Sequence, residues 1–162
     1  MRLTFWTGFW VFLLDQLSKY LVVHWLDLAN IGRIEVFPPF LVFRMAWNTG
    51  VNFGLLSGAD MRWVLVVVAL AITGGVLVWV WREKDNPWMQ IGAGLLAGGA
   101  IGNVLDRLIY GAVADFLNMS CCGIENPWSF NVADIAIFLG AFGLIFLTGG
   151  APKDRDAADG TG

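Results

Sequence analysis

Four apolar segments, each close to the length needed to cross a bilayer, constrain what this chain can fold into. They run over Phe5–Leu26, Met61–Trp81, Trp88–Ile109 and Val132–Thr148. A transmembrane helix needs about 20 mostly apolar residues. Of the 162 residues, 57% are hydrophobic and 14% charged, whereas soluble domains have roughly 45–50% and 25%. The sequence therefore predicts an all-α integral membrane protein with four transmembrane helices.

The segments between the predicted helices differ in length and character. Residues 27–60 form the longest connection, and their alternating stretch Val36–Met45 predicts a small strand pair at the membrane surface. The final residues are rich in Gly, Pro, Asp and Lys and have no apolar period, so we expect a disordered tail at 151–162. Since no internal repeat is visible, residues 1–150 are expected to form one domain.

Lysine and arginine residues predict the orientation of the helices. With four spans, both termini lie on one side. That side carries Arg2, Arg82, Lys84, Lys153 and Arg155, whereas the other carries Arg33, Arg44 and Arg62 over a much longer loop. This bias predicts that both termini are cytoplasmic and both large loops are outside. The reverse topology is the alternative.

Ionisable residues in the apolar segments are costly in a membrane and therefore indicate candidate functional sites. Asp15 and Lys19 are four residues apart, on one face of the first predicted helix. They are interpreted either as an internal ion pair that orients this helix or as residues that contact substrate. Asn48 begins a second polar stretch, residues 48–54, which is either a simple turn or a grip for an extended peptide.

Two more polar clusters flank the last connection. Asn103, Asp106 and Arg107 lie near the end of the third predicted helix, and Asn103 is expected to face the other two. Asn131 and Asp134 lie in the first turn of the fourth, where the helix dipole favours an ionised carboxylate. A role in capping this helix is the simpler interpretation of Asn131 and Asp134.

The topology makes Asp115 and Asp134 candidates for a facing pair. The third predicted helix leaves the membrane near Tyr110 and the fourth enters near Asn131, so both ends lie on the same side. Two carboxylates in contact share a proton, since both cannot ionise cheaply. Such a dyad holds a base that activates water and an acid that protonates a leaving amine. It can hydrolyse a peptide bond without a metal or a covalent intermediate.

Other chemistry and other partners fit the sequence less well. The single histidine, His24, has no suitable Ser or Cys partner and no zinc-ligand spacing, so we expect no metal and no cofactor. The net charge of −3 does not suggest nucleic-acid binding. Cys121 and Cys122 are interpreted as loop residues, with a redox or lipid-modified pair as the alternative. The spacing of Gly94, Gly98 and Gly102 predicts close packing between helices.

Five motifs, in order along nearly the whole chain, resemble lipoprotein signal peptidase (signal peptidase II) of bacteria. They are Asp15-Gln16-Leu17-Ser18-Lys19, Asn48-Thr49-Gly50 with Phe53-Gly54, the stretch Gly98 to Arg107, Gly111-Ala112-Val113-Ala114-Asp115-Phe116, and Phe130-Asn131-Val132-Ala133-Asp134.

The resemblance implies a specific function. Members of that family are inner-membrane aspartic endopeptidases that remove signal peptides from prolipoproteins, just before a cysteine carrying a diacylglyceryl group. Asp115 and Asp134 match the catalytic pair. Asp15, Lys19, Asn48, Asn103, Asp106, Arg107 and Asn131 match residues that position substrate or support the dyad. The resemblance also implies a small extracytoplasmic β cradle between the first two helices and an active site near the periplasmic face.

Some positions depart from the family's common pattern. Val51 and Asn52 replace two small residues, Gly54 stands where Ser is common, and Ala114 replaces a frequent Val. None of these changes removes a required carboxylate, so they bear on substrate preference and inhibitor contacts rather than on the reaction. A small transporter and a noncatalytic scaffold are the rival functions. The first is disfavoured because the chain has no inverted repeats and its polar groups collect near one interface, and the second because it does not explain the five polar motifs. The expected partners are prolipoproteins and membrane lipids, and the protein is expected to be monomeric.

Overall fold

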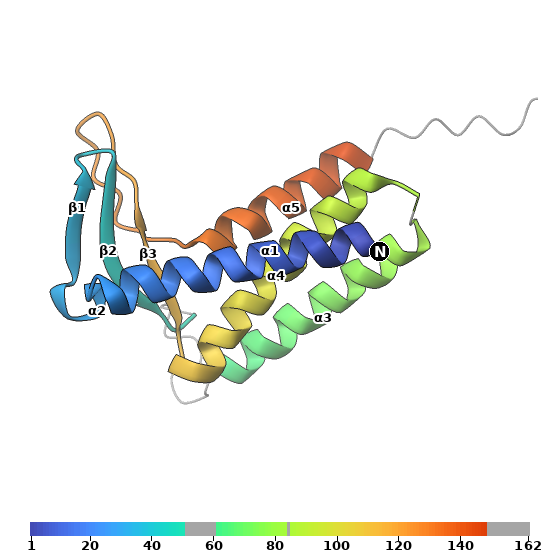
Figure 1. Ribbon diagram of the computed structural model, residues 1–162, viewed down its shortest axis with the longest axis horizontal. Helices are drawn as coiled ribbons and strands as arrows, with labels where there is room; N and C mark the ends of the chain where they lie inside the picture. The colour runs from blue at the N-terminus through green and yellow to red at the C-terminus, as the bar shows by residue number, and fades with distance from the viewer. Residues whose placement is uncertain (51–60, 84, 149–162) are drawn as a thin grey trace, which may run out of the picture.

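The computed structural model describes residues 1–50, 61–83 and 85–148. Four long helices form a bundle, and a small antiparallel sheet lies across one end of it (Figure 1). The helical elements are α1 (Arg2–Lys19), the π-helical η1 (Tyr20–Trp25), α2 (Leu28–Ile31), α3 (Met61–Arg82), α4 (Pro87–Tyr110) and α5 (Val132–Thr148). The strands are β1 (Arg33–Phe37), β2 (Leu41–Asn48) and β3 (Val113–Asn118).

Helix α4 is the centre of the bundle and packs against α1, α3 and α5. Its glycines allow this, because a Cβ at Gly98 would overlap the carbonyl oxygen of Gly8 on α1. A Cβ at Gly102 would lie 2.5 Å from Asp15 Oδ2. The predicted glycine face is therefore confirmed as the contact between α1 and α4. The helix ends at Gly111, whose φ of +77° is in the left-handed region that terminates helices.

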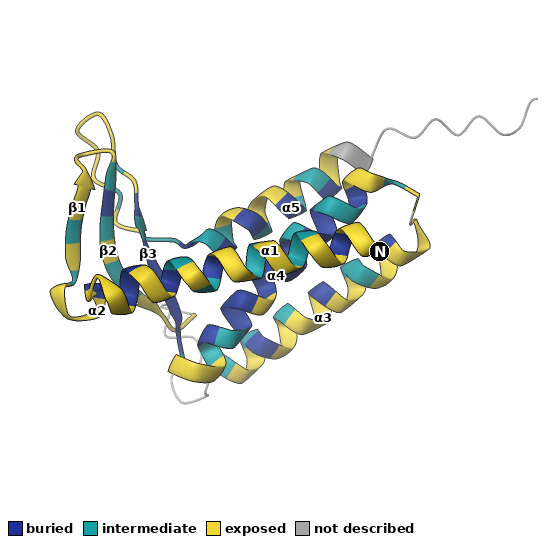
Figure 2. Cartoon of the chain, in the orientation of Figure 1, coloured by how far each residue is buried: buried dark blue, intermediate teal, exposed yellow. Residues whose placement is uncertain are grey.

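Two of the four long helices are long and apolar enough to cross a membrane by length and composition. They are α3 and α4, and their apolar windows are 17% and 56% buried inside the protein. Helix α1 carries three charged residues in 18, and α5 has only 17 residues. Large apolar side chains are nevertheless exposed along all four long helices (Figure 2). The four-span prediction is thus supported for α3 and α4, and it stays a prediction for α1 and α5.

The sheet has one strand more than the sequence predicted. Strands β1 and β2 form the expected antiparallel pair, and β3 adds to β2 in the order β1-β2-β3. The predicted fold, helical with a small β cradle after the first long helix, is therefore confirmed in part: the molecule is mostly helical with a small antiparallel sheet, but the third strand, β3, comes from the connection between α4 and α5. Strand β3 is almost entirely buried and lacks the polar–apolar alternation that reveals a half-exposed strand.

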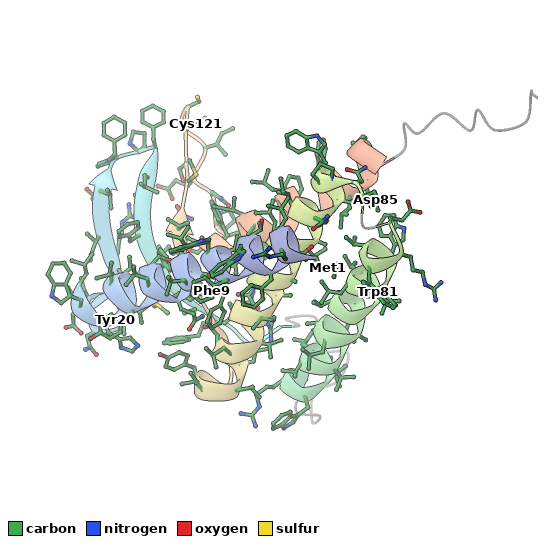
Figure 3. All side chains as sticks on the ribbon, turned by 45° about the vertical axis from the view of Figure 1, so that its right-hand side comes forward. Met1, Phe9, Tyr20, Trp81, Asp85 and Cys121 are labelled. Carbon is green, nitrogen blue, oxygen red and sulfur yellow. The ribbon has the colours of Figure 1, made fainter. Side chains whose placement is uncertain are left out.

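The two ends of the bundle differ in what they carry. Met1, Trp81 and Asp85 lie at the end opposite the sheet (Figure 3). The sheet end carries η1 and α2, and Val22 of η1 packs with Phe116 of β3 in a small hydrophobic core. The first predicted helix therefore changes to π geometry after Lys19 instead of continuing regularly to Leu26.

The predicted tail at 151–162 and residues 51–54 of the polar stretch lie outside the described residues.

Candidate active site

Asp115 and Asp134 come together at the junction of the sheet and the bundle. Asp115 lies on β3, and Asp134 lies in the first turn of α5. Asn131 connects them, because its Nδ2 donates to Asp115 Oδ1 at 2.6 Å and its backbone N–H donates to Asp134 Oδ2 at 3.2 Å. The structure thus brings together the two carboxylates that the topology argument paired.

Amide groups surround this pair of carboxylates. Asn48 Nδ2, at the end of β2, donates to Asp115 Oδ2 at 3.0 Å, and Asn103 Nδ2 donates to Asp134 Oδ1 at 2.9 Å. The backbone N–H of Asp134 donates to Asn131 Oδ1 at 2.9 Å, which completes a reciprocal cap of the kind seen in capping boxes. Capping and pairing with Asp115 are therefore compatible roles for Asp134. No lysine or arginine among the described residues forms an ion pair with either carboxylate.

Burial makes Asp115 harder to ionise than an ordinary aspartate. Its side chain lies on β3, outside the helices, and the residue is 3% exposed. Desolvation, followed by the charge of Asp134, raises the pKa of Asp115 from 3.8 to about 6. Hydrogen bonds from Asn48 and Asn131 and the charge of Lys19 oppose this shift and only partly offset it. The pair therefore retains a proton at a pH where isolated aspartates have lost theirs.

A second pair of carboxylates, Asp15 and Asp106, lies beside the backbone of the first pair and shares one lysine. Lys19 Nζ lies 2.8 Å from Asp15 Oδ2 and 2.7 Å from Asp106 Oδ2. All three residues are buried. Asp15 Oδ1 accepts the backbone N–H of Ala133 at 2.9 Å, and Asp106 Oδ2 accepts that of Ala114 at 3.2 Å. Asp15 and Lys19 are therefore buried and form the internal ion pair that the sequence offered as one of two interpretations.

Asn103 connects the shared lysine, Lys19, with the dyad. Its Oδ1 accepts from Lys19 Nζ at 3.2 Å and from Asn131 Nδ2 at 3.3 Å, while its Nδ2 donates to Asp134. The expected contact between Asn103 and Asp106 is replaced by these bonds. Arg107 does reach back to this residue, but its Nη1 donates to the backbone oxygen of Asn103 at 3.2 Å.

Arg107 lies within electrostatic reach of the dyad. Its guanidinium is half-buried and interacts with the charges of Asp115, Asp134 and Asp106. Its buried Nε has no hydrogen-bond partner among the described residues. A buried donor without a partner is costly, so this atom marks a point of the site where the described residues leave a polar group unsatisfied.

Sequence reasoning missed Gln16 as a member of the site. Its Nε2 lies 3.1 Å from both Asp15 Oδ2 and Asp106 Oδ1, and 3.4 Å from the oxygen of Gly102. This amide therefore joins α1 to α4 beside the shared lysine. The available signal was a glutamine within an apolar helix, where an amide needs a partner as much as a charge does.

The described residues offer no cluster of three or more His, Cys, Asp or Glu side chains able to hold a metal ion. Cys121 and Cys122 are free and exposed, in the loop that follows β3 (Figure 3). The carboxylates of the site are held by amides, backbone N–H groups and one lysine. Such an arrangement is suited to acid–base chemistry by the side chains themselves.

Comparisons with known proteins agree on one family. The family profile described as "Signal peptidase (SPase) II" matches residues 8–148. The chain is 37% identical to lipoprotein signal peptidase of Rhodopseudomonas palustris, over 90% of this chain and 91% of that protein. It is 34% identical to the Pseudomonas aeruginosa protein of the same name, over 96% and 92%. A bacterial membrane enzyme solved by the in meso method at 1.9 Å resolution superposes with a TM-score of 0.77, at 28% identity over 96% of each chain.

Proposed function

Because the chain belongs to the signal peptidase II family of membrane aspartic proteases, we propose that it cleaves signal peptides from diacylglyceryl-modified prolipoproteins with an Asp115/Asp134 dyad. The observation that best supports the assignment of Asp115 and Asp134 as a dyad is that Asn131 donates a hydrogen bond to each of them. Lipoprotein signal peptidases similar to this chain supply the substrate class. The cut is expected just before the lipidated cysteine.

Asp115 and Asp134 have different environments, which suggests different roles. Asp115 is the buried member with the raised pKa, so it is assigned the shared proton. Asp134 accepts hydrogen bonds from Asn103 and from the backbone of Asn131 at the start of α5, and it is assigned the role of the base. Asp134 therefore takes a proton from water, and the resulting hydroxide attacks the scissile carbonyl. Asp115 gives its proton to the carbonyl oxygen.

The second half of the reaction returns both protons. The carbon–nitrogen bond breaks, and the proton taken up by Asp134 passes to the leaving amine of the lipidated cysteine. Asp115 recovers a proton from the tetrahedral oxygen as the new carboxyl group forms. Neither carboxylate becomes covalently attached to the substrate.

The remaining residues support this chemistry in three ways. Asn48, Asn103 and Asn131 orient the two carboxylates through the hydrogen bonds described above. Asp15, Lys19 and Asp106 hold the backbone next to each catalytic aspartate. Arg107 is assigned a role in positioning substrate beside the dyad, because its guanidinium interacts with the charges of Asp115 and Asp134.

The expected setting is the bacterial inner membrane. α1 and α5 are proposed to span it with α3 and α4, with both termini cytoplasmic and the sheet on the periplasmic side. The enzyme is proposed to act as a monomer, and its carboxylates need no cofactor. Residues 151–162 are proposed to be a disordered cytoplasmic tail.

The substrate assignment can be tested with three versions of one prolipoprotein: diacylated, unmodified, and Cys→Ser at the lipidation position. The protein is purified in detergent and cleavage is followed by mass spectrometry of both products. We expect cleavage of the diacylated form alone, with the lipidated cysteine at the new N-terminus. Equal cleavage of all three forms would contradict the requirement for the lipid.

A further inference from the structure

The loop that follows β3 carries the two cysteines of the chain side by side. Cys121 and Cys122 are the only cysteines among the 162 residues. Both are free and exposed, and Cys121 lies at the outer tip of the loop, away from the helical bundle (Figure 3). Neither thiol belongs to the proposed catalytic site. A disulfide within one chain can therefore join only these two sulfur atoms.

A tight turn holds the two thiols at the tip of the loop. The backbone N–H of Ile124 donates to the carbonyl oxygen of Cys121 at 2.9 Å, which closes a turn of four residues. Its central residues, Cys122 and Gly123, have φ values of +58° and +81°. Positive φ at both central positions is typical of a type I′ turn, which favours Gly, Asn or Asp. Cys122 therefore presents its thiol from a backbone conformation that is unfavourable for cysteine.

Separate hydrogen bonds fix the base of this loop. Asn118 Nδ2, at the end of β3, donates to the carbonyl oxygens of Asn126 and Trp128, both at 2.8 Å. The backbone N–H of Asn126 donates to Ser120 Oγ at 3.0 Å. These bonds close the loop between the turn and the strand. The backbone around the cysteines can therefore rearrange without displacing β3, the strand that carries Asp115.

The two thiols also contact each other. They are hydrogen-bonded, and this bond raises the pKa of Cys121. Since the thiolate is the form that attacks a disulfide, Cys121 fits the role of the second, resolving thiol. Two thiols held in one turn react at a high effective concentration. A mixed disulfide formed at one sulfur atom is therefore within reach of the other thiol as soon as it forms.

A disulfide between neighbouring residues is strained. Consecutive Cα atoms lie about 3.8 Å apart, whereas relaxed disulfides join Cα atoms that are roughly 4.4–6.8 Å apart. Strained or exposed disulfides are more easily reduced than the permanent disulfides of secreted proteins. The position of Cys121 and Cys122 thus suits reversible exchange with other disulfides and does not suit a permanent cross-link.

We propose that Cys121 and Cys122 are a reversible modification site that is oxidised by small disulfides to a disulfide between the two neighbours. The thiolate of Cys122 attacks a disulfide RSSR, which forms a mixed disulfide and releases RS⁻, and the proton lost by Cys122 converts RS⁻ to RSH. The sulfur of Cys121 then attacks that of Cys122, and the second RSH leaves with the proton of Cys121. The two cysteines lose two electrons, and RSSR is reduced to two RSH.

This site does not depend on the proposed proteolytic activity. Its exposure to an oxidising compartment rests on the proposed periplasmic position of the sheet. The effect of the pair is to keep oxidation within one molecule, because the second thiol removes any group that becomes attached to the first.

The test uses the full chain in detergent, oxidised glutathione as the disulfide, and intact-mass spectrometry after quenching with acid. We expect wild type to become lighter by two hydrogen atoms, to carry no glutathione and to lose both sites of reaction with N-ethylmaleimide. Reduced glutathione should restore both thiols. Cys121→Ser and Cys122→Ser lack the second thiol, so each should retain one attached glutathione. The double variant Cys121→Ser/Cys122→Ser is the control and should keep its mass.

Several results would overturn the proposal. Wild type that retains glutathione would show that the two neighbours do not close a disulfide. A disulfide-linked dimer as the main product in non-reducing electrophoresis would show that oxidation joins separate molecules. Two thiols that still react with N-ethylmaleimide would show that no exchange occurs, and a disulfide that reduced glutathione does not open would contradict reversibility. None of these measurements uses cleavage of a prolipoprotein, so they are independent of the proposed protease activity.

Discussion

The two pairs of carboxylates in this protein lie close together but differ in what neutralises them. Asp15 and Asp106 share the ammonium of Lys19 at 2.8 and 2.7 Å. Asn131 donates to both Asp115 and Asp134, from its side-chain amide and from its backbone N–H respectively, and neither carboxylate forms an ion pair with another described residue. Amides orient a carboxylate without cancelling its charge.

This difference fits the proposed roles, in which Asp15 and Asp106 are structural and Asp115 and Asp134 are reactive. A buried carboxylate that touches a lysine has a cation beside it and can hold backbone N–H groups, as Asp15 and Asp106 do. Two neighbouring carboxylates without a cation of their own are more easily accommodated with a proton between them. The raised pKa of Asp115, about 6, is the sign of that state. Substitutions in either pair, or in the residue that connects them, should therefore have different effects.

The largest effect is expected from the pair without a lysine. Asp134→Asn and Asp115→Asn each remove an acid or base from the proposed dyad, whose contribution is of order 10²–10⁴-fold. We expect kcat for cleavage of a diacylated prolipoprotein to fall at least about 10³-fold in each, with neither variant less stable than wild type at neutral pH. Exposed Asp27 provides the matched control, Asp27→Asn, which should retain full activity. A variant of either dyad residue with near wild-type kcat would remove that residue from the mechanism.

The lysine shared by Asp15 and Asp106 should instead determine stability. Lys19→Met leaves Asp15 and Asp106 buried together without their cation, and breaking a buried pair in this way costs about 3–5 kcal/mol. We expect a large drop in the melting temperature in detergent. The triple variant Lys19→Met/Asp15→Asn/Asp106→Asn, which also removes both charges, should recover much of the loss. If the triple variant is no more stable than Lys19→Met, the charge argument fails.

The sequence was sufficient to predict much of the helical fold and the candidate dyad, because both depend on simple rules. Apolar length predicted the helices, and the shared side of two helix ends brought Asp115 and Asp134 together. The same reasoning could not reveal strand β3, since its burial removes the alternation that marks a strand. It also could not find the partners of Asp115, because Asn48 and Asn131 are 67 and 16 residues away in the chain.

The connection between the two pairs depends on Asn103. Its Oδ1 accepts from Lys19 and its Nδ2 donates to Asp134, so the lysine fixes which way the amide points. Asn103→Ala should allow Asp134 to shift, and a misplacement of about 1 Å costs roughly 10²-fold in rate. We expect kcat to fall by about that factor with KM little changed. Exposed Asn30 offers the control Asn30→Ala. A change confined to KM would instead indicate that Asn103 contacts substrate.

The smallest effect concerns stability and pH. Folded Asp115 binds its proton more tightly than the unfolded chain does, because its pKa rises from 3.8 to about 6. The folded state is therefore favoured at low pH, and this contribution is lost as the pH rises through that window. The full shift corresponds to about 3 kcal/mol, at 1.36 kcal/mol for each pKa unit. Asp115→Asn has no such proton, so its stability relative to wild type should increase between about pH 4 and about pH 6 and stay level above.

The new amide at position 115 turns its NH₂ toward a donor, either Asn48 or Asn131, which lowers the net gain. We therefore expect about 1–2 kcal/mol above pH 6, measured as the difference in melting temperature between Asp115→Asn and wild type across the pH series. The cost of the mismatched amide does not depend on pH, so it displaces the whole curve without changing its slope. A difference in melting temperature that does not change from about pH 4 to about pH 7 would show that Asp115 ionises as an ordinary aspartate. The two pairs of carboxylates would then not differ in whether they hold a proton.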